Sequence, residues 1–247
     1  MDKFWYTPQT YKNLFGNDFK SIPFYGAIHI AELLITIGLS FALFRFYKKA
    51  NKATRRRTLL VLTVLIILDE ILKYVATIST DQWLWQYLPL HLCSINIFVC
   101  TIHTITESDK VKDFLYAVCI PGAMLALLMP SWFVAPVFNV MHIHSFTIHA
   151  LLLIYSVVVL ADGYRPNLRR IPYNAMYLIL MTIPIYFLNK LLNTNFMFTN
   201  KPNEVFLTEW LYKLFGNYYI FAFPFILIII WIIIYIPWLM KPKKSIA

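Results

Sequence analysis

Long runs of apolar residues alternate along this chain with short polar segments. Seven of these runs reach the roughly 20 residues that a helix needs to cross a lipid bilayer. None shows the period-two alternation of a barrel strand, and lipid tolerates no unpaired backbone, so the runs predict helices. We expect membrane-spanning helices at residues 24–47, 57–77, 88–106, 112–129, 143–162, 171–192 and 219–240.

Two further segments, 4–15 and 204–216, are amphipathic rather than uniformly apolar. In the second, Leu207, Trp210, Leu211 and Leu214 fall on one face of a helix. Such segments are typical of helices that lie in the membrane interface, where they can also cover a cavity. The linkers are short and no internal repeat is visible. The pattern therefore predicts an all-α membrane protein, a bundle of seven transmembrane helices in a single domain, 1–247.

The basic residues decide the expected orientation. The chain is 60% hydrophobic and 14% charged, with a formal net charge of +10. Fifteen of the 22 Lys and Arg residues lie between spans one and two, three and four, five and six, or after span seven. The positive-inside rule then places the N-terminus outside and the C-terminus in the cytoplasm. This distribution accounts for the charge without a nucleic-acid partner.

Polar residues inside the spans gather at one depth. Ionisable groups are costly in lipid and mark function or a buried pair. With the orientation above, almost all of them fall in the outer half of the membrane, which favours a polar cavity open to the outer leaflet. Each one alone is also typical of helix packing. The group consists of His29, Glu32, Asp69, Glu70, Lys73, His91, Cys93, His149, Lys190 and Asn193.

Cys93 is the candidate nucleophile of this cavity. It lies near the start of span three, where the helix dipole favours a thiolate. His91 is two residues away and would point to the opposite side of the helix, so the base should come from another span. His149 lies at a matching depth and is the first choice, with His29 next. We expect Glu70 to orient the histidine.

Other chemistries fit parts of the same pattern. His142, His144 and His149 form an H-x-H-x4-H sequence, and imidazoles suit zinc, but no Cys or Asp lies nearby to complete a site. We therefore predict no metal, and a metal-dependent lipid hydrolase stays an alternative. Seven spans with internal charges also suit a transporter, although polar residues do not continue to the inner face.

Several short motifs resemble those of the YwaF-like bacterial integral membrane proteins. They are LPLHLCSIN (88–96), SFTIHALL (145–152), DGYRP (162–166) and LNKLLNTNFMF (188–198). The resemblance covers about residues 25–240. The bacterial family is similar in turn to a eukaryotic family of multispan lysophospholipid acyltransferases. It implies that Cys93 carries the acyl chain and that His149, or else His144, is the base. It also implies a multi-pass protein of the bacterial cytoplasmic membrane.

Together these observations predict an acyltransferase that moves a fatty acyl chain through a Cys93 thioester. The donor would be a membrane phospholipid, and the acceptor a lysophospholipid or an exported amine or hydroxyl, with no cofactor. Glu32 is an alternative to Glu70 as the orienting carboxylate. The alternative function is a non-catalytic lipid-binding or solute-binding membrane protein, or a transporter. The expected substrate-binding residues are His91, His29, Glu32, Lys73, Lys190, Asn193 and Asn195.

Overall fold

The computed structural model describes residues 3–16, 21–202 and 206–240, and its regular secondary structure there is entirely helical. Six stretches have the length and hydropathy of a membrane span, so the predicted count of seven is not confirmed. The segment expected as span two lies in α3 (Lys52–Ser79), which is long enough but carries charged residues along its length. The six stretches are Ala27–Lys49, Trp85–Thr106, Asp109–Leu128, Val140–Asp162, Leu168–Leu192 and Leu207–Leu239.

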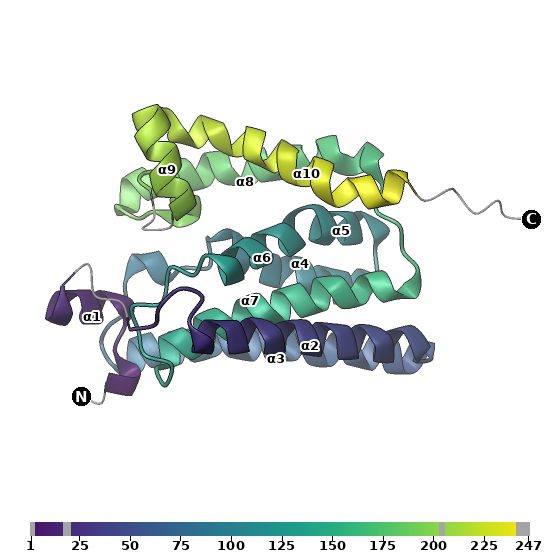
Figure 1. The fold of residues 1–247 in the computed structure, drawn as a ribbon, viewed down its shortest axis with the longest axis horizontal. Coiled ribbons are helices and arrows are strands. Elements are labelled where there is room, and N and C mark those ends of the chain that lie inside the picture. The colour runs from purple at the N-terminus through teal and green to yellow at the C-terminus, as the bar shows by residue number, and fades with distance from the viewer. Residues whose placement is uncertain (1–2, 17–20, 203–205, 241–247) are drawn as a thin grey trace, which may run out of the picture.

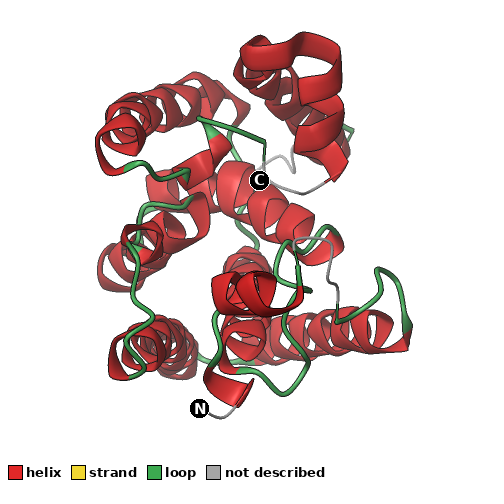
Figure 2. Ribbon diagram, turned by 90° about the vertical axis from the view of Figure 1, so that its left-hand side faces the viewer, coloured by secondary structure: helices red, strands yellow, loops and turns green. Residues whose placement is uncertain are grey.

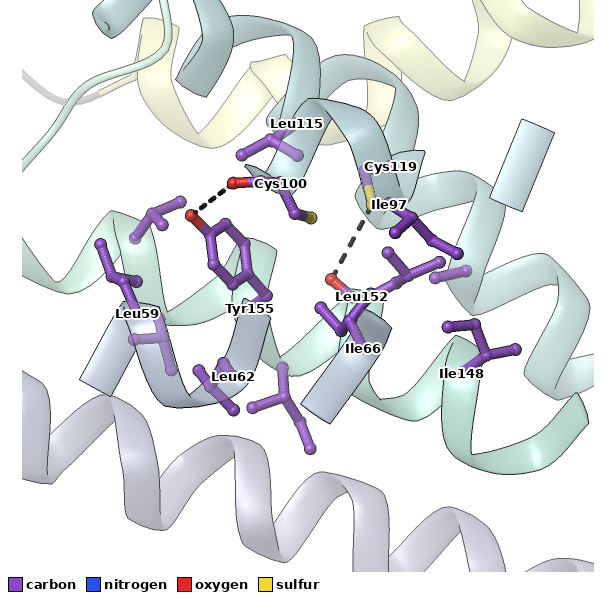
Figure 3. Close-up of a cluster of buried hydrophobic side chains, with 14 of the residues drawn as sticks. Leu59, Leu62, Ile66, Ile97, Cys100, Leu115, Cys119, Ile148, Leu152 and Tyr155 are labelled. Atoms are coloured by element: carbon purple, nitrogen blue, oxygen red, sulfur yellow. Dashed lines mark hydrogen bonds between the residues drawn. The ribbon is translucent and has the colours of Figure 1, made fainter. Parts of the chain in front are cut away.

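Helix α7 (Val140–Val158) lies between α2 (Ala27–Lys49) and α3 on one side and α4 (Leu92–Thr106) and α6 (Ile120–Leu128) on the other (Figure 1), and Figure 2 shows the helices of the molecule turned by 90° from that view. It packs against α2, α3 and α4. The core between them is built around Tyr155, whose hydroxyl donates a hydrogen bond to the Cys100 carbonyl at 3.0 Å (Figure 3). This apolar interior holds α3, α4 and α7 in fixed register, which matters because all three carry the expected site residues.

The span at 109–128 is not a regular α-helix. It consists of α5 (Asp109–Phe114), a π-helical turn (Leu115–Cys119) and α6 (Ile120–Leu128). Pro121 has no N–H to give to the carbonyl of Ala117, so regular α-helical bonding must break here. The Trp231 Nε1–H donates to that carbonyl at 2.8 Å. The proline therefore removes the α-helical donor of a buried carbonyl, to which a tryptophan from another helix donates instead.

Helices α8 (Ile171–Leu192), α9 (Phe206–Phe215) and α10 (Phe223–Leu239) form a separate layer beside this group (Figure 1). Trp231 and Tyr235 of α10 pack against Tyr116 and Val118 of the π-helical turn. The predicted interfacial segment 204–216 corresponds to α9, apart from its first residues, which lie outside the described part of the chain.

One end of the bundle, where α3 ends and α4 and α7 begin, is covered by other parts of the chain; we call it the covered end. The predicted interfacial segment 4–15 forms a 3-10 turn (Lys3–Trp5) and α1 (Pro8–Phe15) over it. Asn139 Nδ2 donates to the carbonyls of Lys3, Phe4 and Tyr6 at 3.1, 2.9 and 2.9 Å. This amide ties the N-terminal segment to the start of α7.

Candidate functional site: a cysteine and a histidine at the covered end

Cys93 is the second residue of α4. The helix starts later than the expected residue 88 because Pro89 and a 3-10 turn (Trp85–Tyr87) precede it. His91 is the N-cap residue, with extended backbone and no capping hydrogen bond from its side chain. The first N–H groups of a helix have no partner within it, so they and the helix dipole favour an anion at Cys93. Cys93 is half-buried.

His149 lies near Cys93 and belongs to α7. The two side chains are close enough to interact electrostatically. His149 Nδ1 lies 2.6 Å from the backbone carbonyl oxygen of Ser145, one helical turn earlier. A carbonyl can only accept, so Nδ1 carries the proton and Nε2 keeps its lone pair. This tautomer suits a base that receives the thiol proton.

Trp132 fixes the plane of the same imidazole. Its ring stacks on His149 with centroids 5.0 Å apart and an interplanar angle of 7°. Trp132 belongs to the loop between α6 and α7, and it is buried together with Phe133. In the sequence it lies between the spans expected at 112–129 and 143–162. A single tryptophan among seven gave no signal that it would contact the base.

The carboxylates of α3 meet His144 rather than His149. His144 Nδ1 lies 3.1 Å from Asp69 Oδ2, and its Nε2 lies 3.9 Å from Glu70 Oε2. Glu70 also forms a short ion pair with Lys73, and both side chains are buried. Glu70 therefore interacts with His144 instead of the predicted base, whose orientation comes from the Ser145 carbonyl. Lys73 lies inside this cluster as the partner of Glu70.

A second histidine–carboxylate pair joins α2 to α7. His142 Nε2 and Glu32 Oε1 are 2.7 Å apart. His142 Nδ1 and Glu32 Oε2 are buried and have no hydrogen-bond partner among the described residues. Thus His142, His144 and His149 each turn to a different partner. In the described part of the chain no three His, Cys, Asp or Glu side chains converge as a metal site would require.

His29 does not join the group around Cys93. It is 2% exposed, and its Nδ1 accepts a hydrogen bond from the Tyr25 N–H at 3.0 Å. Its Nε2 donates to the Leu127 carbonyl at 2.9 Å. With both ring nitrogens engaged by backbone groups, this side chain fastens the start of α2 to the end of α6.

Three of the predicted substrate-binding residues lie in the last turn of α8 and in the loop after it, which has its own hydrogen bonds. Lys190 is exposed, with its ammonium 5.3 Å from the centre of the Tyr186 ring. Asn193 ends α8 in the left-handed conformation, at φ 52°. Asn195 Oδ1 accepts from the N–H groups of Asn200 and Lys201 at 3.1 and 3.2 Å. None of these contacts brings the three residues to Cys93.

Asn189 gives the LNKLLNTNFMF segment its shape. It is fully buried, its Oδ1 accepts from the Phe196 N–H at 2.8 Å, and its Nδ2 donates to the Phe196 carbonyl at 2.9 Å. The loop places Phe196 and Phe198 against His91, with ring centroids 5.2 and 5.6 Å apart. The motif thereby supports the residue at the N-cap of the Cys93 helix.

Asn96 is a further residue that the sequence analysis missed. It lies three residues after Cys93, so the two share a face of α4. It is 2% exposed, and its Oδ1 has no hydrogen-bond partner among the described residues. An unpaired buried acceptor is costly, so a group outside the chain is a suitable partner for it. The only signal in the sequence was an amide within an apolar run.

The DGYRP motif lies at the opposite end of the bundle, far from Cys93 along α4 and α7. Asp162 Oδ2 is 2.7 Å from Lys112 Nζ, and the Tyr164 hydroxyl donates to the Asp109 carbonyl at 3.0 Å. Arg170 Nη1 lies 2.7 Å from Asp113, which is fully buried. These contacts fasten the connection between α7 and α8 to α5, which is a structural role.

The sequence profile of the TMEM164 family matches residues 24–235. The chain belongs to the TMEM164 family. It is accordingly a multi-pass membrane protein, as its apolar helices indicate. No curated protein and no solved structure gives a significant match to it. Cys93, His149 and Glu70 all lie inside the matched range.

Proposed function

We propose that this protein is a membrane-embedded acyltransferase that moves a fatty acyl chain through a thioester on Cys93. The observation that carries the proposal is the thiol–imidazole pair at the start of α4, with His149 Nδ1 held by the Ser145 carbonyl. This combination supplies a nucleophile, a base in the required tautomer and a helix N-terminus.

In the first half-reaction His149 Nε2 takes the proton of the Cys93 thiol. The sulfur attacks the carbonyl carbon of a phospholipid ester, and an S–C bond forms. The negative charge on the carbonyl oxygen falls beside the free N–H groups of the first turn of α4, which stabilise it. The C–O bond then breaks, and the proton on His149 passes to the oxygen of the departing lysolipid.

In the second half-reaction an acceptor hydroxyl or amine gives its proton to His149 Nε2. The acceptor attacks the thioester carbon, the C–S bond breaks, and the Cys93 sulfur recovers the proton. The acceptor is a lysophospholipid, or an exported amine or hydroxyl. Both half-reactions balance without a cofactor, and His149 ends in its starting tautomer.

The proposed setting is the bacterial cytoplasmic membrane, with α3 as a seventh span. The N-terminus then lies outside, so the covered end and Cys93 face the outer leaflet. Asp69, Glu70 and Lys73 can be accommodated in a spanning α3 because they pair with one another and with His144. The basic loops between spans supply the orientation.

The proposal is tested by acyl transfer in vesicles. Purified protein is reconstituted with a phosphatidylcholine that carries deuterated acyl chains and with an unlabelled lysophospholipid, and labelled product is followed by mass spectrometry. Cys93→Ser and His149→Gln should each abolish transfer. Cys119→Ser, which alters a buried thiol in the core, is the matched control and should keep it. Transfer that continues in Cys93→Ser would overturn the thioester mechanism.

A non-catalytic binding or transport function is the second candidate. The Glu32–His142 pair favours it, because acyl transfer does not use this pair and two of its polar atoms lack partners in the described part of the chain. A proton or a polar solute would suit such a site. Solute uptake or solute binding that requires Glu32 but not Cys93 would favour the binding or transport function.

A further inference from the structure

The covered end closes Cys93 off from the aqueous side of the bundle. Trp132 and Phe133 of the α6–α7 loop are 7% and 1% exposed. The N-terminal segment lies over that end, held by Asn139 and by Gln82, whose Nε2 donates to the Trp5 carbonyl at 2.9 Å. A long apolar substrate would have to displace both segments to arrive from this direction.

A groove with Glu70 in its wall lies next to this site and opens on the lipid-facing side. It has a volume of about 260 Å³ and lies between α3 and α4, directly below the turn at Pro89. Cys93 and Ile97 are four residues apart on α4, and Thr101 is four further on, so one helical face carries all three. The groove walls include Ile67, Glu70, Pro89, Ile97, Phe98 and Thr101.

The lining of the groove suits a hydrocarbon chain. Apart from Glu70 at one end, its walls are aliphatic or aromatic, and the Thr101 hydroxyl already donates to the Ile97 carbonyl at 2.9 Å. Phe98 and Ile67 are 54% and 36% exposed on the outside of the bundle, where lipid tails lie. Beyond Glu70, a polar solute would find few partners along this path.

The distance from Cys93 to Thr101 along α4 is close to half the thickness of the hydrocarbon core. Eight residues separate Cys93 from Thr101, which at 1.5 Å per residue is about 12 Å. Half of the hydrocarbon core is about 15 Å thick. A chain whose carbonyl carbon is at Cys93 therefore runs along the groove toward the bilayer centre, with Phe98 and Thr101 beside its far end.

We propose that the α3–α4 groove binds the acyl chain of the donor lipid, which reaches Cys93 sideways from the bilayer, and that Thr101 and Phe98 limit the chain length. This inference rests on the proposed acyl transfer for its chemistry. The binding site itself follows from the groove and the closed aqueous side, and it can be tested separately.

The test offers reconstituted protein an equal mixture of phosphatidylcholines with acyl chains of 8 to 18 carbons and reads the chain attached to Cys93 by intact mass. Thr101→Trp fills the far end of the groove and should lower the ratio of the longest to the shortest chains by roughly tenfold. Phe98→Ala opens the wall and should raise that ratio. Ile102→Trp, on the lipid-exposed side of α4 outside the groove, is the control and should leave it unchanged.

A phosphatidylcholine with a photoactivatable diazirine near the end of its acyl chain gives a readout that needs no acylation. It should crosslink to groove residues of α3 and α4 in wild type and Ile102→Trp, and much less in Thr101→Trp. An acylated wild type whose chain distribution is unchanged in both groove variants would overturn the groove and leave the proposed function intact. Without any acylation the proposed function fails, and the crosslinks alone support or overturn the groove.

Discussion

The buried pair of Glu70 and Lys73 allows structural and catalytic roles to be separated. Glu70→Gln leaves the Lys73 ammonium without its carboxylate in an interior where both residues are less than a tenth exposed. Breaking such a pair from one side costs about 3–5 kcal/mol of folding free energy. Replacing both partners, as in Glu70→Met with Lys73→Met, removes the uncompensated charge and should restore stability to within about 1 kcal/mol of wild type.

The activity of the double variant decides the role of Glu70. The tautomer of His149 is set by the Ser145 carbonyl, 2.6 Å away, and His144 keeps its contact with Asp69 at 3.1 Å. We therefore expect the double variant to be acylated at Cys93 within about tenfold of the wild-type rate, because a positioning change of this kind costs little.

The assay combines thermal unfolding in detergent with the rate of Cys93 acylation by a phospholipid donor. Asp109→Asn is the matched control, since Asp109 also pairs with a lysine three residues away, at 3.5 Å, but is exposed to solvent. It should cost less than about 1 kcal/mol. A double variant that folds as stably as wild type and loses acylation by more than about a hundredfold would refute the reasoning and make Glu70 part of the chemistry.

Three more substitutions probe the account. Asn96→Leu should leave the stability unchanged or raise it by about 1–3 kcal/mol, because an unpaired buried acceptor disappears. Acyl transfer by this variant should fall if the acceptor holds the substrate. Thermal unfolding and acyl transfer are measured on one preparation. Asn189→Ala should free Phe196, increase protease cleavage of the 193–200 loop and lower acylation. Trp231→Phe should cost about 1–3 kcal/mol in thermal unfolding, because the Ala117 carbonyl loses its donor; an unchanged midpoint would contradict that role.

Helix positions were predictable because the runs are long and apolar. The position of a residue along its span also placed Cys93 and His149 at one level of the membrane. That assignment needed only the spans and the charge bias, and the structure brings the two side chains near each other. The predicted orientation of His91 was wrong because the helix starts a few residues later than expected. Pro89 delays α4 until Leu92, so this histidine is an N-cap residue and does not point around the helix.

Depth carries no information on the direction in which a side chain points. Glu70 and His29 share the level of Cys93, but one turns to Lys73 and His144, and the other is held by backbone groups. Direction depends on the rotation of each helix, which packing sets. Trp132 contacts the base from a loop, where no periodicity exists to place it.

The central claim is that Cys93 carries an acyl chain, and intact mass spectrometry of protein purified from its native membranes tests it most directly. The account predicts a mass increase of one fatty acyl group that neutral hydroxylamine removes and that Cys93→Ala never shows. An unmodified wild-type protein that also stays unmodified after incubation with phospholipid donors would contradict the account and leave Cys93 a packing residue.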